Sequence, residues 1–129
     1  MKKLLRILAI ALCAITGTTF ADDFKSITIP GDGAATTETA LTRVHGDQFL
    51  FVRNFTQEDG TTRGVVIVSQ PNSNTGMPVN VLAAALLDQS MPTEVINTVV
   101  IAGPADVSVT CGASPGKNCF ISFKKEGGN

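Results

Sequence analysis

The feature that most constrains the fold is a series of short β-branched or aromatic runs, each ended by a turn signal. Residues 65–68 (Val-Val-Ile-Val) and 95–102 are two such runs, and side chains of this kind pack well on a pleated, half-buried surface. Turn residues recur between the runs at roughly 8 to 12 residue spacing, which is typical of a β-sandwich. The sequence therefore predicts an all-β fold, a small antiparallel β-sandwich of about six to eight strands.

Two hairpins are expected within this pattern. The first covers residues 48–69 and turns at Asp59-Gly60, where glycine accepts a positive φ. Its strand at 49–52 (Phe-Leu-Phe-Val) is apolar at every position, which is typical of a central strand covered on both faces. The second hairpin joins residues 107–111 to 119–123 through Ser-Pro-Gly-Lys at 114–117, which matches a type II turn.

One segment is ambiguous between strand and helix. Residues 79–81 (Val-Asn-Val) begin like a strand, whereas Leu82-Ala83-Ala84-Ala85-Leu86-Leu87 has high helix propensity and Asn80 is available as an N-cap. The pattern favours a strand that turns helical after Leu82. The alternative fold is therefore α+β, with one helix near residues 82–89.

Residues 1–21 have the pattern of a secretory signal peptide. Lys2, Lys3 and Arg6 precede an apolar run at 7–15, and the small residue Ala21 ends the stretch. The apolar run is shorter than the roughly 20 residues that cross a bilayer, so we expect no membrane span. The prediction is an exported bacterial protein, periplasmic or extracellular, whose single β domain covers residues 22–129.

Cleavage after Ala21 would remove Cys13 and leave Cys111 and Cys119 as the two cysteines of the exported domain. In an oxidising compartment two such thiols are expected to pair. The predicted hairpin around them would bring both positions within disulfide reach. Redox sites normally place only two residues between their cysteines, so this spacing favours a structural disulfide.

Charge and motif content narrow the classes of partner. Removing the three basic residues of the signal leaves seven basic and eleven acidic residues, a net charge of −4. An acidic balance disfavours nucleic acid and anionic lipid headgroups as partners. We expect no cofactor, because neither a nucleotide-binding motif nor a metal-binding motif stands out.

The single histidine, His45, is the one candidate for general-base catalysis. Asp47 is near it in sequence, but no serine sits in a nucleophile-elbow pattern. One histidine and two disulfide-bonded cysteines are too few to hold zinc. Calcium at Asp32 or at Glu58-Asp59 stays open, although neither site has calcium-loop spacing. No catalytic or metal residue is therefore assigned from the sequence.

Three functions are compatible with these observations. The leading hypothesis is a non-enzymatic binding or structural protein of the bacterial envelope or exterior, acting through a β surface or a strand edge on another protein or cell-surface component. The alternative is an inhibitor of a secreted hydrolase that inserts the loop at 112–118 or at 57–63 into an active site. The third is a small hydrolase built around His45 and Asp47.

Overall fold

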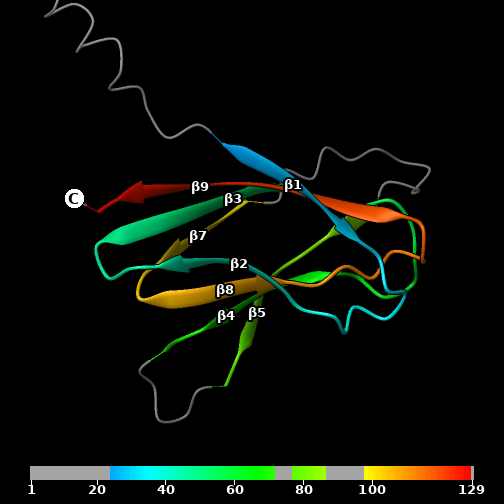
Figure 1. The fold of residues 1–129 in the computed structure, drawn as a ribbon, viewed down its shortest axis with the longest axis horizontal. Coiled ribbons are helices and arrows are strands. Elements are labelled where there is room, and N and C mark those ends of the chain that lie inside the picture. The colour runs from blue at the N-terminus through cyan, green and yellow to red at the C-terminus, as the bar shows by residue number, and fades with distance from the viewer. Residues whose placement is uncertain (1–23, 72–76, 87–97, 129) are drawn as a thin grey trace, which may run out of the picture.

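The structure, a computed structural model, describes residues 24–71, 77–86 and 98–128. Within these ranges it contains nine strands and no helix, in two layers (Figure 1). The strands are β1 (Lys25–Pro30), β2 (Thr39–Val44), β3 (Gln48–Gln57), β4 (Val65–Ser69), β5 (Val79–Ala83), β6 (Ala85–Leu86), β7 (Thr98–Ala102), β8 (Ala105–Val109) and β9 (Asn118–Gly127). The predicted small β-sandwich is confirmed.

The two layers are sheets of different strand order. Sheet A has the order β1-β9-β3-β6, with β7 also paired to β3, and sheet B has the order β2-β8-β4-β5. All pairings are antiparallel except the short β3–β6 pair. Strands β1 and β2 are therefore edges of the two sheets, and β5 is the other edge of sheet B.

The core lies between the sheets and follows the two-residue period of their strands. Along β8, Ala105, Val107 and Val109 are buried while Asp106 and Ser108 alternate with them. Leu50 and Val52 of β3 face the same interior from sheet A and are fully buried. Burying each such side chain stabilises by about 1.5 to 3 kcal/mol, which makes this interior the main source of fold stability.

Both predicted hairpins are wrong, because each pair of strands is divided between the two sheets. β3 pairs with β9, β7 and β6 in sheet A, whereas β4 pairs with β5 and β8 in sheet B. Likewise β8 belongs to sheet B and β9 to sheet A. The connections at 58–64 and 110–117 are long enough to cross the roughly 10 Å between packed sheets. Their turn residues mark a reversal without specifying which sheet the chain enters next.

The helix proposed as an alternative near residues 82–89 is wrong for residues 82–86, which lie in or between strands. Residues 87–89 are outside the described ranges. Leu82 packs against the core and Ala84 is completely enclosed, with its N–H donating to the Gly64 carbonyl at 2.9 Å. This tertiary pairing overrides the helix propensity of the alanines and leucines.

The predicted signal peptide also lies outside the described residues. Among the residues that are described, no helix has the length and apolar character needed to cross a membrane.

Candidate functional site

Three connections converge at one end of the sandwich (Figure 1), and the predicted cysteine pair flanks most of one of them, at 110–117. Cys111 follows β8 in sheet B and Cys119 lies in β9 of sheet A; their sulfurs are 2.10 Å apart and their Cα atoms 5.8 Å apart. Both residues are buried. The disulfide thus joins the two sheets, instead of two strands of one hairpin, and it has the environment of a structural cross-link.

Gln57 supplies the polar counterpart of this cross-link. Its side chain is fully buried at the end of β3. The amide Nε2 donates to the carbonyl oxygens of Asp59 at 2.7 Å and Thr62 at 2.9 Å, and Oε1 accepts from the backbone N–H of Gly64 at 2.8 Å and of Gly112 at 3.2 Å. One side chain therefore fixes the connections at 58–64 and 110–117 together. Sequence reasoning missed this role, because an isolated glutamine in a polar stretch has no pattern that marks it.

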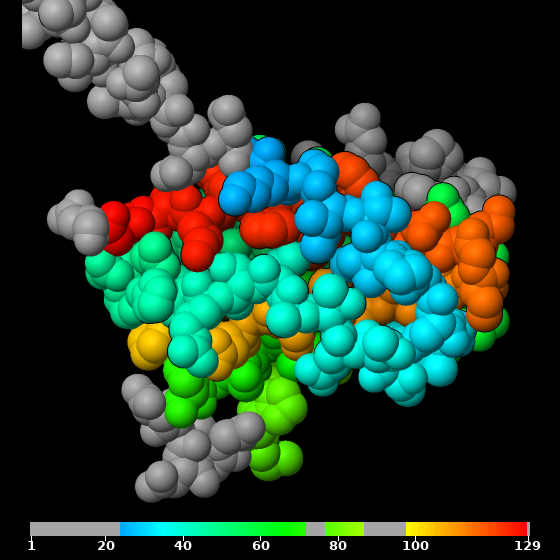
Figure 2. Space-filling view, viewed as in Figure 1, coloured from blue at the N-terminus to red at the C-terminus, as the bar shows by residue number. Residues whose placement is uncertain are grey.

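Close backbone contact between the same two connections requires a glycine. A Cβ atom at Gly112 would overlap the carbonyl oxygen of Thr62. The connection at 31–38 joins the contact from β1, since the Gly31 N–H donates to Lys117 O at 2.9 Å and the Gly33 N–H to Ala113 O at 2.8 Å. Figure 2 shows this connection lying against the 110–117 segment. The loops at this end are thus held in one arrangement.

The acidic residues considered as calcium ligands accept hydrogen bonds from backbone N–H groups of these loops. Asp32 accepts hydrogen bonds from the backbone N–H groups of residues 34–37, at 2.6–2.9 Å. These bonds, that of Thr37 above all, hold the pKa of the Asp32 carboxyl well below its usual range. Asp59 Oδ1 accepts from Ser114 N, and Glu58 Oε2 accepts from Asn118 N. The described residues contain no group of three or more potential metal ligands.

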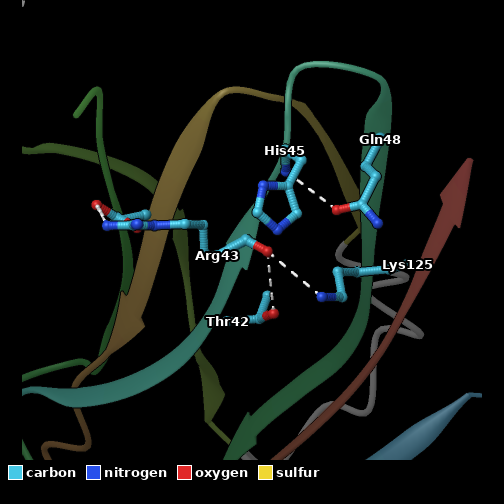
Figure 3. Close-up of polar contacts among 6 residues, drawn as sticks. Thr42, Arg43, His45, Gln48 and Lys125 are labelled. Carbon is cyan, nitrogen blue, oxygen red and sulfur yellow. Dashed lines mark hydrogen bonds and ion pairs between the residues drawn. The ribbon is translucent and has the colours of Figure 1, made fainter. Parts of the chain in front are cut away.

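His45 lies in the exposed turn between β2 and β3, at the opposite end of the sandwich. Its backbone N–H donates to Gln48 Oε1 at 3.0 Å, and its carbonyl accepts from the Gln48 N–H at 3.0 Å (Figure 3). Nearby, Lys125 Nζ donates to the Arg43 carbonyl at 3.4 Å, which ties β9 to β2. The hydrogen bonds that the structure shows for His45 run through its backbone. They therefore provide no nucleophile–base contact for the hydrolase hypothesis.

The outer face of sheet B is polar where β2 pairs with β8. Arg43 Nε lies 2.7 Å from Asp106 Oδ1, and this guanidinium lowers the pKa of the Asp106 carboxyl. A hollow of about 400 Å³ lies beside this pair and is also lined by Glu38 and Ser69. Both charged groups are well exposed, so the pair contributes little to stability. This part of the face has the composition expected of a solvated surface.

The exposed large apolar side chains are found elsewhere, in two separate groups. The first lies on the outer side of sheet A, and we call it the aromatic face: Phe24, Phe49, Val100 and Phe120, together with the half-buried Phe51. The second borders strand β5, and we call it the β5 edge: Met77, Val79 and Val81. Phe49 is 49% exposed, Val100 55% and Val79 59%. Apolar groups gathered in this way on an exported domain indicate interaction surfaces.

The aromatic face corrects the expectation that the 49–52 run is covered on both sides. Leu50 and Val52 point into the core, whereas Phe49 and Phe51 point outward from sheet A. Across the strands, Phe51 is paired with Val100 of β7 and with Lys124 of β9. The apolar run at 49–52 therefore has one buried face and one exposed apolar face, where the sequence pattern predicted two buried faces.

The β5 edge is a strand edge without charge. Within the described part of the chain, β5 pairs only with β4. Residues 65–87 contain no charged side chain. By contrast, the edge strand β1 carries Lys25 and Pro30, and the edge strand β2 carries Arg43. Natural sheets commonly guard open edges with such residues, and β5 lacks them.

Comparisons with known proteins give a fold likeness only. No protein-family model matches the chain, and no curated protein matches it. Among solved structures, the chain is similar to a protein of Bacillus endospore appendages, described as a novel family of disulfide-linked pili. The TM-score is 0.53 at 15% sequence identity, over 81% of this chain and 84% of that one. This likeness supports the sandwich architecture described above.

Proposed function

We propose that the chain is an exported, non-enzymatic structural or binding protein of the bacterial envelope or exterior, and that it acts by pairing its β5 edge with an extended strand of another protein chain. The observation that carries this proposal is the uncharged β5 edge with its exposed valines. A strand added there would form backbone hydrogen bonds along residues 79–81 and cover their apolar side chains. No ligand chemistry beyond backbone pairing and apolar contact is needed.

Two further observations support a role outside the cytoplasm. The disulfide between Cys111 and Cys119 fits an oxidising compartment. The sandwich is similar in fold to a protein of disulfide-linked pili. Export by the N-terminal 21 residues completes the proposal, and mass spectrometry of the protein recovered from bacterial cells should find Asp22 at its N-terminus.

The β5 edge is tested by placing a charge on it. The substitution Val81→Lys should abolish association of the exported protein with its partner chain, because an ammonium group on the edge would have to be desolvated on pairing. Association is measured by light scattering and by affinity capture from envelope fractions. The matched control is Ala40→Lys on β2, an edge that already carries Arg43. Equal association of Val81→Lys and the wild type would refute the edge as the docking site.

One observation favours the inhibitor alternative. The loops predicted to enter an active site, 57–63 and 112–118, lie side by side and are fixed to each other by Gln57. Thr61, Thr62 and Arg63 are exposed there. A rigid exposed loop loses little conformational entropy on binding, which favours affinity. Inhibition assays against secreted proteases and lysozymes test this function, and an Arg63→Ala variant should weaken any inhibition found.

A further inference from the structure

The aromatic face has opposite charges on the two sides of Phe51. On β3, Arg53 and Phe49 lie on opposite sides of Phe51 in the outward-facing row, about 13 Å apart along the strand. Glu126 of β9 is the cross-strand neighbour of Phe49. The face therefore carries a basic group on one side of Phe51 and an acidic group on the other, and Phe120, opposite Thr56, lies beyond the basic group.

The central cation of this face is already paired within the chain. Lys124 Nζ forms an ion pair with Glu126 Oε1, and it lies 5.1 Å from the centre of the Phe24 ring and 5.3 Å from that of Phe51. Its side chain is only 24% exposed. Lys124 is thus part of the packed surface and adds no free charge to the middle of the face.

The Arg53 guanidinium is available to a partner, whereas the Glu126 carboxylate is already shared with Lys124. Arg53 lies 5.4 Å from the centre of the Phe24 ring, and it forms no ion pair among the residues that the structure describes. The Glu126 side chain is 43% exposed beside its ion pair. A partner that covers the apolar middle therefore binds most favourably if it places an anion over Arg53 and a cation over Glu126. The order of its charges along the strand is then the reverse of the order on this face.

We propose that the aromatic face packs against the same face of a second copy of this chain, in a two-fold arrangement with the β3 strands antiparallel. The two-fold axis then passes near Phe51, and Arg53 of each copy lies over the second copy's Phe49. Glu126 of that copy is one strand spacing away, about 4.8 Å, which is within reach of an arginine side chain. Each copy contributes the same two contacts, as an isologous interface requires.

The second copy fits this face better than a lipid surface does. An anionic membrane would favour a surface of one sign, whereas here an exposed carboxylate lies on the side of Phe51 opposite the arginine. The aromatic face is also distinct from the β5 edge, since the two belong to different sheets. The dimer can therefore be tested independently of the function proposed above.

A charge exchange tests the arrangement. Sedimentation velocity is measured on exported protein carrying Val81→Lys, so that association through the β5 edge does not contribute. We expect a concentration-dependent dimer whose dissociation constant rises at least about tenfold with Arg53→Glu or with Glu126→Arg alone. The double variant recreates opposite charges across the interface and should bring the constant back toward that of the parent.

Two further variants separate the aromatic face from the rest of the surface. Phe49→Lys places a charge in the apolar row and should leave only monomer, whereas Arg43→Glu makes the same charge reversal as Arg53→Glu on the outer face of sheet B and should leave the dissociation constant of the dimer unchanged. Melting temperatures establish that each variant is folded. A parent protein that stays monomeric, a dimer that survives Phe49→Lys, or a double variant no tighter than the single ones would each overturn the proposal.

Discussion

At the scale of single residues, the Gln57 side chain supplies four hydrogen bonds to backbone groups of the connections at 58–64 and 110–117. Replacing it with methionine, an unbranched side chain of similar length, leaves two partly buried carbonyls and two buried N–H groups without that partner. We expect the free energy of unfolding to fall by about 3 kcal/mol, measured by urea denaturation. Gln70→Met, at an exposed position after β4, is the control and should change it by less than about 0.5 kcal/mol.

The Asp32 carboxylate gives stability a dependence on pH. Its pKa is lowered in the folded state by hydrogen bonds from backbone N–H groups. A lowered pKa stabilises the fold above the unfolded value of about 3.9 and loses that contribution as the pH falls toward the folded value. The melting-temperature difference between wild type and Asp32→Asn should therefore be largest near neutral pH and shrink below about pH 4. A difference that stays constant over this range would contradict the assignment.

At the scale of elements, the sequence specifies where strands and turns lie better than it specifies their partners. The runs at 65–68 and 107–111 predicted the strands later found as β4 and most of β8. The sheet to which each strand belongs depends on contacts that no local pattern contains, among them the Gln57 hydrogen bonds and the close contact of Gly112 with the 58–64 connection. That is why the two connections between the sheets, at 58–64 and 110–117, were predicted to be the turns of two hairpins.

The assignment of β8 and β9 to different sheets also determines which elements the disulfide joins. Because it closes a short loop and also joins the sheets, replacing both Cys111 and Cys119 with serine should lower the free energy of unfolding by about 2 to 3 kcal/mol. Thermal unfolding of the wild type in reductant should match the double variant in its absence. Association measured at low temperature should be retained by the folded variant. Loss of association with unchanged stability would instead indicate a redox role for the pair.

At the scale of the whole molecule, the two apolar surfaces differ in how visible they are in the sequence. The outward phenylalanines of β3 are part of a run that is apolar at every position, a pattern shared by strands buried on both faces. Only the structure shows that one of those faces is turned away from the core. The β5 edge depends on the absence of charge over residues 65–87 together with the strand order of sheet B. The candidate surfaces could thus be found only with both the sequence and the topology.

The two surfaces together predict how the protein assembles. A single two-fold interface closes a pair, whereas two different two-fold interfaces on one subunit propagate an open chain. If the β5 edge pairs with the β5 edge of another copy, wild-type protein should form chains visible by electron microscopy. Val81→Lys should then stop assembly at the dimer formed through the aromatic face, Phe49→Lys at the dimer formed through β5, and the double variant at the monomer. Wild-type protein that stops at the dimer would contradict copy-to-copy pairing at β5, because the partner of that edge would then be a different chain.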